Sequence, residues 1–148
     1  MRILIQRVSK AKVTVADKIT GEIGKGLLIF LGVGEDDTAA ISAEMAGKTA
    51  RLRIFEDETG KMNLDVNEVS GSILVVSQFT LFADTRKGNR PNFTAAAKPE
   101  RAKKLYEKFI SDLKELLGEN RVAEGVFGAM MEVELINDGP VTIWIDSC

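Results

Sequence analysis

Two uninterrupted apolar runs constrain the fold of this chain more than any other feature. The first spans 27–33, and the second spans 73–76 and is followed by Ser77-Gln78-Phe79. Short continuous apolar runs bounded by turn-forming residues are typical of strands buried in the centre of a sheet. We therefore predict central strands at 27–33 and 73–79. A length of 148 residues corresponds to one domain with a sizeable core.

Alternation of apolar and polar residues predicts further strands. The first two are expected at 2–8 and 12–16, separated by Ser9-Lys10, and a short one at 19–23. Three more are expected toward the end of the chain: one near Val122, one at 131–136 and one at 141–145. A hairpin-like turn is expected at 57–60.

Two segments have the spacing of helices. Ile41, Met45, Thr49 and Leu52 lie on one face of the first. The second begins at Pro99 and ends at Gly118, which suit the first turn and the end of a helix. The predicted fold is α+β, a single domain over 1–148 with a mostly antiparallel sheet or partial barrel and two main helices.

Composition narrows the class of protein. Hydrophobic residues make up 45% of the chain and charged residues 28%, as in ordinary globular proteins. No apolar run approaches the roughly 18 residues of a membrane span, and the first residues do not form a signal peptide. The single cysteine, Cys148, excludes a disulfide framework. We expect a cytoplasmic protein with no membrane partner.

Charge is unevenly distributed. The net charge of −2 and the pI of about 5.3 argue against a nucleic-acid binder. Between Arg86 and Lys108, however, eight basic residues face only Glu100 and Glu107, so this segment carries +6. Such a zone attracts a polyanion, or it is simply a solvated helix face preceded by a basic loop. Charge alone leaves both interpretations open.

Two motifs of other protein classes are imitated but incomplete. Gly47-Lys48-Thr49 resembles the end of a phosphate-binding loop, but it lies within the first predicted helix, where backbone N–H groups are already bonded. The acidic clusters at 35–37 and 56–58 have no histidine or cysteine beside them, and capping and turn solvation explain them. We expect neither a metal nor a cofactor.

The SQFTL motif (residues 77–81) places two hydroxyls and a carboxamide at the end of the second buried run. A serine or threonine nucleophile needs a base within hydrogen-bond reach, and the chain contains no histidine. No G-x-S-x-G elbow surrounds Ser77. The alternative is a buried strand whose hydroxyls bond to local backbone groups.

The NxGPVT motif (residues 137–142) places Gly139-Pro140 between two predicted strands. Glycine permits unusual backbone angles, and proline removes a donor and accepts a cis bond. A tight turn between two strands is the interpretation that the residues alone favour.

Together these motifs resemble the D-aminoacyl-tRNA deacylase family, of the D-Tyr-tRNA deacylase type. The resemblance extends over the whole chain and includes both motifs at the expected separation. Outside the motifs it rests on segments 6–9, 21–24, 30–33, 53–57, 60–63, 83–88, 90–91 and 127–129, and on Met131.

The resemblance implies hydrolysis of the ester of D-aminoacyl-tRNA by an obligate homodimer with two interface sites. It implies catalytic roles for Ser77, Gln78, Phe79 and Thr80, and substrate binding by a cis Gly139-Pro140 unit from the partner subunit. Carbonyls of that unit would reject an L-aminoacyl side chain, so glycyl-tRNA is expected to be cleaved too. The expected partners are a second copy, the 3′ end of tRNA and the D-amino acid, with no DNA.

The family resemblance leaves two mechanisms open. Thr80 acts as a covalent nucleophile, or the ribose 2′-OH of the substrate helps to activate water. Because the chain has no histidine, we favour the second, with N–H groups of Phe79 and Thr80 stabilising the oxyanion. The competing functions are a non-enzymatic RNA-binding or dimerisation module on the same scaffold and an esterase for small acyl esters.

Overall fold

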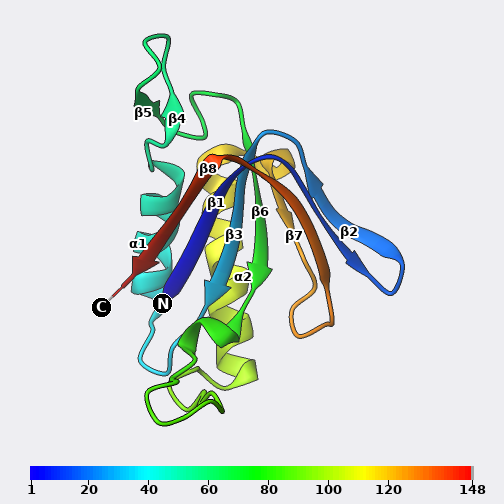
Figure 1. Cartoon of the computed structure of the whole chain (residues 1–148), viewed down its shortest axis with the longest axis vertical. Coiled ribbons are helices and arrows are strands. Elements are labelled where there is room, and N and C mark those ends of the chain that lie inside the picture. Colours follow the sequence, from blue (N-terminus) through cyan, green and yellow to red (C-terminus); the bar gives the residue numbers. More distant parts are fainter. Residues whose placement is uncertain (148) are drawn as a thin grey trace.

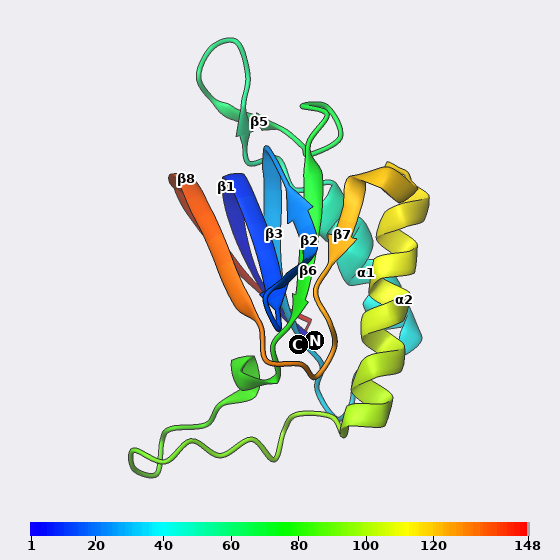
Figure 2. The ribbon, with the colours of Figure 1, turned by 90° about the vertical axis from the view of Figure 1, so that its right-hand side faces the viewer.

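The fold is described from a computed structural model, which describes residues 1–147; Cys148 lies outside the described residues. Six strands form one curved sheet, and two helices lie against one of its faces (Figures 1 and 2). The sheet strands are β1 (Arg2–Val15), β2 (Lys18–Ile23), β3 (Gly26–Gly32), β6 (Ser72–Ser77), β7 (Val122–Glu124) and β8 (Glu132–Asp146). The helices are α1 (Ala39–Ala50) and α2 (Pro99–Leu117), and a small hairpin is formed by β4 (Phe55–Glu56) and β5 (Met62–Leu64).

The sheet is mixed. Its order is β2-β1-β3-β6-β7, and β8 pairs with β1 along nearly its whole length. β1 is antiparallel to β2, β3 and β8, whereas β3–β6 and β6–β7 are parallel. The predicted α+β class with two main helices is therefore confirmed. The prediction of a mostly antiparallel sheet is correct for the three pairings made by β1, but the pairings of β6 with β3 and β7 are parallel.

The two apolar runs form the central strands β3 and β6, as predicted. Alternate residues of both strands enter two separate cores, because successive side chains point to opposite faces of a sheet. The first core lies under the helices and includes Leu27, Ile29, Ile73, Val75, Phe109 and Leu113. The second lies on the opposite, concave side and includes Val8, Val13, Leu28, Leu74 and Val76.

The sheet curls until β2 approaches β7, as Figure 1 shows. A Cβ atom placed on Gly21 would lie 2.5 Å from the carbonyl oxygen of Glu124, so only glycine permits this approach. The curvature encloses the second core and corresponds to the predicted partial barrel.

Two predicted strand breaks are wrong. The segments 2–8 and 12–16 are one strand, β1, and the segments 131–136 and 141–145 are one strand, β8. The two long strands stay paired because bulges absorb the extra residues, with register shifts on either side of Val8. Gly139-Pro140 therefore lies at a bulge inside a strand and not in a tight turn.

The helices begin and end close to the predicted residues. Pro99 is the first residue of α2, and Gly118, with a positive φ of 103°, follows its last turn. The Oγ1 of Thr38 accepts a hydrogen bond from the Ile41 N–H at the start of α1. The segment 47–49 lies inside α1, as expected. Within residues 1–147, no helix combines the length and apolar character needed to cross a membrane.

Candidate active site

The SQFTL motif begins in β6 and leaves it by a sharp change of direction. β6 ends at Ser77, and Gln78 still donates its N–H to the carbonyl of Leu31 in β3 at 2.8 Å. A single-turn 3-10 helix, Phe79–Phe82, follows. The prediction that the strand continues to Phe79 is wrong. The apolar run does not show where the strand ends. A Cβ on Gly32 would lie 2.9 Å from the Gln78 carbonyl oxygen, so the glycine lets the chain turn against β3.

The 3-10 helix leaves two neighbouring backbone donors at its start. The Leu81 N–H donates to Gln78 O at 3.3 Å and the Ala83 N–H to Thr80 O at 3.0 Å. The first N–H groups of any helix have no acceptor within the helix. Here these are the N–H groups of Phe79 and Thr80, the first two residues of the 3-10 helix. Both residues are exposed. The motif thus has two adjacent amide N–H groups on exposed residues, and neither has an acceptor within the 3-10 helix.

The side chains of the motif contain no base. The carboxamide Nε2 of Gln78 donates to the Oγ1 of Thr80, and an amide does not accept a proton from a hydroxyl. Ser77 is half-buried at the end of β6. The only tyrosine, Tyr106, donates its hydroxyl to Val75 O at 3.1 Å, and burial raises its pKa far above the ordinary value. None of these groups therefore activates a hydroxyl.

An aromatic pair lies beside the donors. Phe79 is 59% exposed and meets Phe93 edge to face, with ring centroids 5.1 Å apart. Phe93 belongs to the long segment 83–98, which is held against itself by the paired residues Asp84 and Asn92. The predicted long loop thus brings a second ring to the motif, a contact that the sequence did not reveal.

The basic segment divides into a paired and an unpaired part. On α2, Lys103, Lys104 and Lys108 each lie within 4.0 Å of a carboxylate one turn away. In the loop, Arg86 is paired with Asp84, and hydrogen bonds from Arg86 lower the pKa of Asp84 to about 2. Among residues 1–147, no carboxylate lies within ion-pair distance of Lys87, Arg90 or Lys98. Arg101 on α2 also has no ion pair there, but it donates to the backbone carbonyl of Asp37 at 2.6 Å. The loop therefore carries most of the unpaired positive charge.

Gly139-Pro140 lies at the bulge of β8 opposite Arg7. The peptide bond between the two residues is cis, and Gly139 has a positive φ of 134°. Arg7 is 5% exposed; its Nε donates to Asp138 O at 3.0 Å and its Nη1 to Ile54 O at 2.8 Å. Sequence reasoning assigned no role to Arg7. The signal that could have indicated a buried role for Arg7 was a charged residue inside a strand of alternating apolar residues.

The two motifs do not meet within one chain. Gly139 lies across from Arg7, whereas Ser77 lies beside Leu31, which pairs with Ile3. An offset of four residues is about 13 Å along a strand, and three strand spacings add about 14 Å across the sheet, giving a separation of about 19 Å. In Figure 1 the segment after β6 lies at the lower end and the bend of β8 near the upper end.

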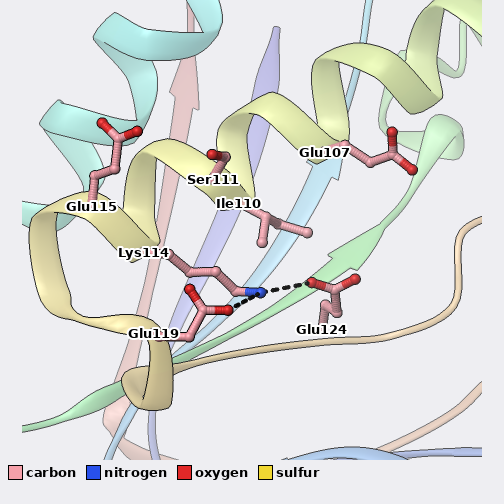
Figure 3. Close-up of a pocket in the computed structure, with 7 residues that line it drawn as sticks. All are labelled: Glu107, Ile110, Ser111, Lys114, Glu115, Glu119 and Glu124. Atoms are coloured by element: carbon pink, nitrogen blue, oxygen red, sulfur yellow. Dashed lines mark ion pairs between the residues drawn. The ribbon is translucent and has the colours of Figure 1, made fainter.

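A separate depression lies beside α2 (Figure 3), and six of its seven lining residues are polar or charged. Its only lysine, Lys114, bridges Glu119 at 3.3 Å and Glu124 at 3.6 Å, so the lining residues neutralise one another in part. The depression is lined by α2 from Glu107 onward together with Glu119 and with Glu124 of β7, and contains no residue of either motif. We assign it no part in the site.

The fold and this strand end define a small α+β protein with two adjacent amide donors on exposed residues, a kind of site that suits acyl-group chemistry. The model of the family described as D-Tyr-tRNA(Tyr) deacylase matches residues 4–146, and the chain belongs to this family. It is 60% identical to the D-aminoacyl-tRNA deacylase of Akkermansia muciniphila and 57% identical to that of Koribacter versatilis, each over 147 residues. Both alignments cover 99% of this chain and 97% of the relative.

A solved structure supports the fold. The protein titled c-Myc DNA Unwinding Element Binding Protein is 39% identical and superimposes with a TM-score of 0.94, covering 99% of this chain and 98% of the other. The fold is thus shared closely with a protein whose title names a DNA-binding property.

Proposed function

We propose that this protein hydrolyses the ester between a D-amino acid and the 3′-terminal ribose of tRNA. Membership of a deacylase family over nearly the whole chain supports the reaction class. The observation that carries the proposal is the pair of N–H groups on the exposed residues Phe79 and Thr80, which have no acceptor within the 3-10 helix and lie in a motif with no base. Such a site stabilises charge on a carbonyl oxygen without supplying a strong nucleophile.

The reaction begins with water attacking the ester carbonyl, which places negative charge on its oxygen. The N–H groups of Phe79 and Thr80 donate to this oxyanion, and one donor of this kind contributes roughly 2.7–4 kcal/mol to transition-state stability. The bond between the acyl carbon and the ribose oxygen then breaks. The proton lost by the water goes to the leaving ribose oxygen, so that free D-amino acid and tRNA result.

Activation of the water is assigned to the substrate. The Thr80 hydroxyl is paired with the Gln78 carboxamide, and the chain has no histidine to deprotonate it. The ribose 2′-OH lies next to the scissile ester in any aminoacyl-tRNA and is well placed to relay a proton. Ser77 and Gln78 position the terminal adenosine and the water.

Chiral selection is assigned to Gly139-Pro140 of a second subunit in a homodimer. The separation of about 19 Å within one chain supports this, because one chain cannot bring the two motifs together. Because a two-fold axis relates the two subunits, each supplies its Gly139-Pro140 unit to the SQFTL motif of the other, and the dimer has two equal sites. Backbone carbonyls of the Gly-Pro unit accept from the substrate ammonium and clash with an L side chain. A glycyl ester has no side chain to reject and is cleaved.

Recognition of the RNA is assigned to the aromatic pair and the loop. The exposed face of Phe79, supported by Phe93, offers a platform on which the terminal adenine stacks. Lys87, Arg90 and Lys98 contact backbone phosphates nearby. Since aminoacyl-tRNA is used in the cytoplasm, this is the compartment that the function requires.

The decisive assay compares hydrolysis of D-Tyr-tRNA, L-Tyr-tRNA and Gly-tRNA by the purified protein. We expect cleavage of the first and third and persistence of the second. Equal resistance of glycyl- and L-aminoacyl-tRNA would remove the exclusion mechanism. Cleavage of p-nitrophenyl esters with D-Tyr-tRNA left intact would favour a small-ester esterase, and tight binding of tRNA or duplex DNA without hydrolysis would favour a binding module.

A further inference from the structure

The side chain of Arg2, at the start of β1, reaches the far end of the SQFTL motif. Its Nη1 donates to the carbonyl oxygen of Leu81 at 3.0 Å, and its Nε donates to Asp146 at 3.0 Å. Its guanidinium also lies 4.5 Å from the ring centroid of Phe82 and 5.9 Å from that of Trp144. One partly buried cation therefore joins β1 and β8 to the 3-10 helix.

We propose that Arg2 is a positioning residue that aims the N–H groups of Phe79 and Thr80 at the oxyanion. The inference rests on the oxyanion function proposed above for these two amides. Arg2 does not touch the substrate; it acts through the carbonyl of Leu81, at the opposite end of the same helical turn.

The 3-10 helix needs such support because it is only four residues long. A single turn contains too few hydrogen bonds to be stable by itself. The carbonyl of Leu81 lies in its last turn, where carbonyls lack a partner within the helix. A guanidinium satisfies it with a charge-assisted bond, which is roughly twice as strong as a neutral one.

The start of the turn is held independently. The bond from Gln78 N–H to Leu31 O fixes the chain as it leaves β6, and the close approach to Gly32 fixes its distance from β3. With Arg2 at the other end, both ends of the turn are anchored. The N–H groups of Phe79 and Thr80 are thereby held in a fixed orientation. Stabilisation of an oxyanion depends on such preorganised geometry.

A different result is expected if the function of Arg2 is purely structural. If its function were only to join β1 to β8 through Asp146, its loss would lower the melting temperature and leave turnover unchanged. Arg121 provides the matched control, since it donates to the carbonyls of Gly71 and Val66 and contacts neither motif. Its loss removes comparable arginine–carbonyl bonds elsewhere in the fold.

The test compares Arg2→Met, Arg2→Lys and Arg121→Met as full-length proteins on D-Tyr-tRNA. Methionine keeps an apolar stem over Phe82 and removes the donors. We expect Arg2→Met to lower kcat about tenfold or more, with KM within about twofold and the preference for D over L unchanged. Arg2→Lys, which keeps a cationic donor, should recover part of the loss. Arg121→Met should lower the melting temperature with kcat unchanged.

Two results would overturn the inference. One is an Arg2→Met protein with the kcat of the wild type, or, if that variant does not fold, a folded Arg2→Lys protein whose kcat equals that of the wild type while its melting temperature falls. The other concerns the amides: Phe79→Pro removes one donor at a position where a helix tolerates proline, and Phe79→Ala keeps it. If both variants are equally active, the proposed amide function fails and the inference with it. If only the Arg2 result fails, the amide function stands.

Discussion

Arg7 donates its Nε–H to the carbonyl of Asp138 at 3.0 Å, so a buried guanidinium holds the residue directly before Gly139-Pro140. The same side chain donates to Ile54 O at 2.8 Å. The backbone carbonyls proposed to select the substrate are therefore anchored by a residue of the neighbouring strand.

Arg7→Lys is expected to loosen this anchor. One ammonium replaces a fork of donors and leaves one of the two carbonyls without its partner, which costs about 1–3 kcal/mol. Urea unfolding should show the loss, and the ratio of kcat/KM for D-Tyr-tRNA over L-Tyr-tRNA should fall. Arg53→Lys is the control, since exposed Arg53 also donates to a carbonyl, that of Asn63. An unchanged D-over-L ratio in Arg7→Lys would contradict the prediction.

Gly139→Ala is expected to damage selection through sterics. Its φ of 134° is one that residues with a Cβ rarely adopt, and an added Cβ would lie 2.8 Å from a methyl of Val141 and 3.0 Å from Arg7 Nη2. Backbone strain of this kind costs about 1–3 kcal/mol, and the adjacent carbonyls must shift.

The matched control is Gly60→Ala, where φ is 77° but a Cβ would meet nothing within 4 Å. It should lose about 1 kcal/mol of stability from the backbone conformation alone and keep its D-over-L ratio. Equal effects of the two substitutions on that ratio would show that crowding at Gly139 does not matter.

The central elements could be predicted from sequence because their signals are local. The buried runs that became β3 and β6, and the Pro99 and Gly118 boundaries of α2, need no knowledge of distant residues. The continuity of β1 and β8 could not be predicted, because Ser9-Lys10 and Gly139-Pro140 look like turns unless the partner strand is known.

The candidate site shows the same division. The SQFTL motif was identified by its residues, but its 3-10 turn depends on close packing against Gly32 of another strand. The carbonyl partner of Arg2 lies 79 residues away in the chain, and that of Arg7 lies 131 residues away. No periodicity in the sequence reports contacts of this kind.

Thr80→Ala is expected to remain active on D-Tyr-tRNA, with a kcat within about tenfold of the wild-type value. The Thr80 hydroxyl bonds to a carboxamide and has no base beside it, so its loss removes no nucleophile. A substrate ending in 2′-deoxyadenosine should be nearly inert with the wild type. Ser77→Ala, which removes a hydroxyl proposed to position the substrate, shows the effect of losing a hydroxyl that is not the candidate nucleophile. Near-complete loss of activity in Thr80→Ala, together with cleavage of the deoxy substrate, would instead establish Thr80 as the nucleophile.

Charge reversal in the loop should weaken tRNA binding more than charge reversal on the helix. Lys87 and Arg90 are exposed, and within residues 1–147 no carboxylate lies at ion-pair distance from them, whereas Lys103 and Lys104 are paired with Glu107 and Glu100. The K87E/R90E double variant should therefore raise KM for aminoacyl-tRNA about tenfold at low salt and reduce the slope of log affinity against log salt by about 1–2. The K103E/K104E variant changes the net charge equally but lies outside the loop, so its effect should be clearly smaller. Equal effects would mean that the RNA senses only the overall field of the protein, and the assignment of phosphate contacts to the loop would be withdrawn.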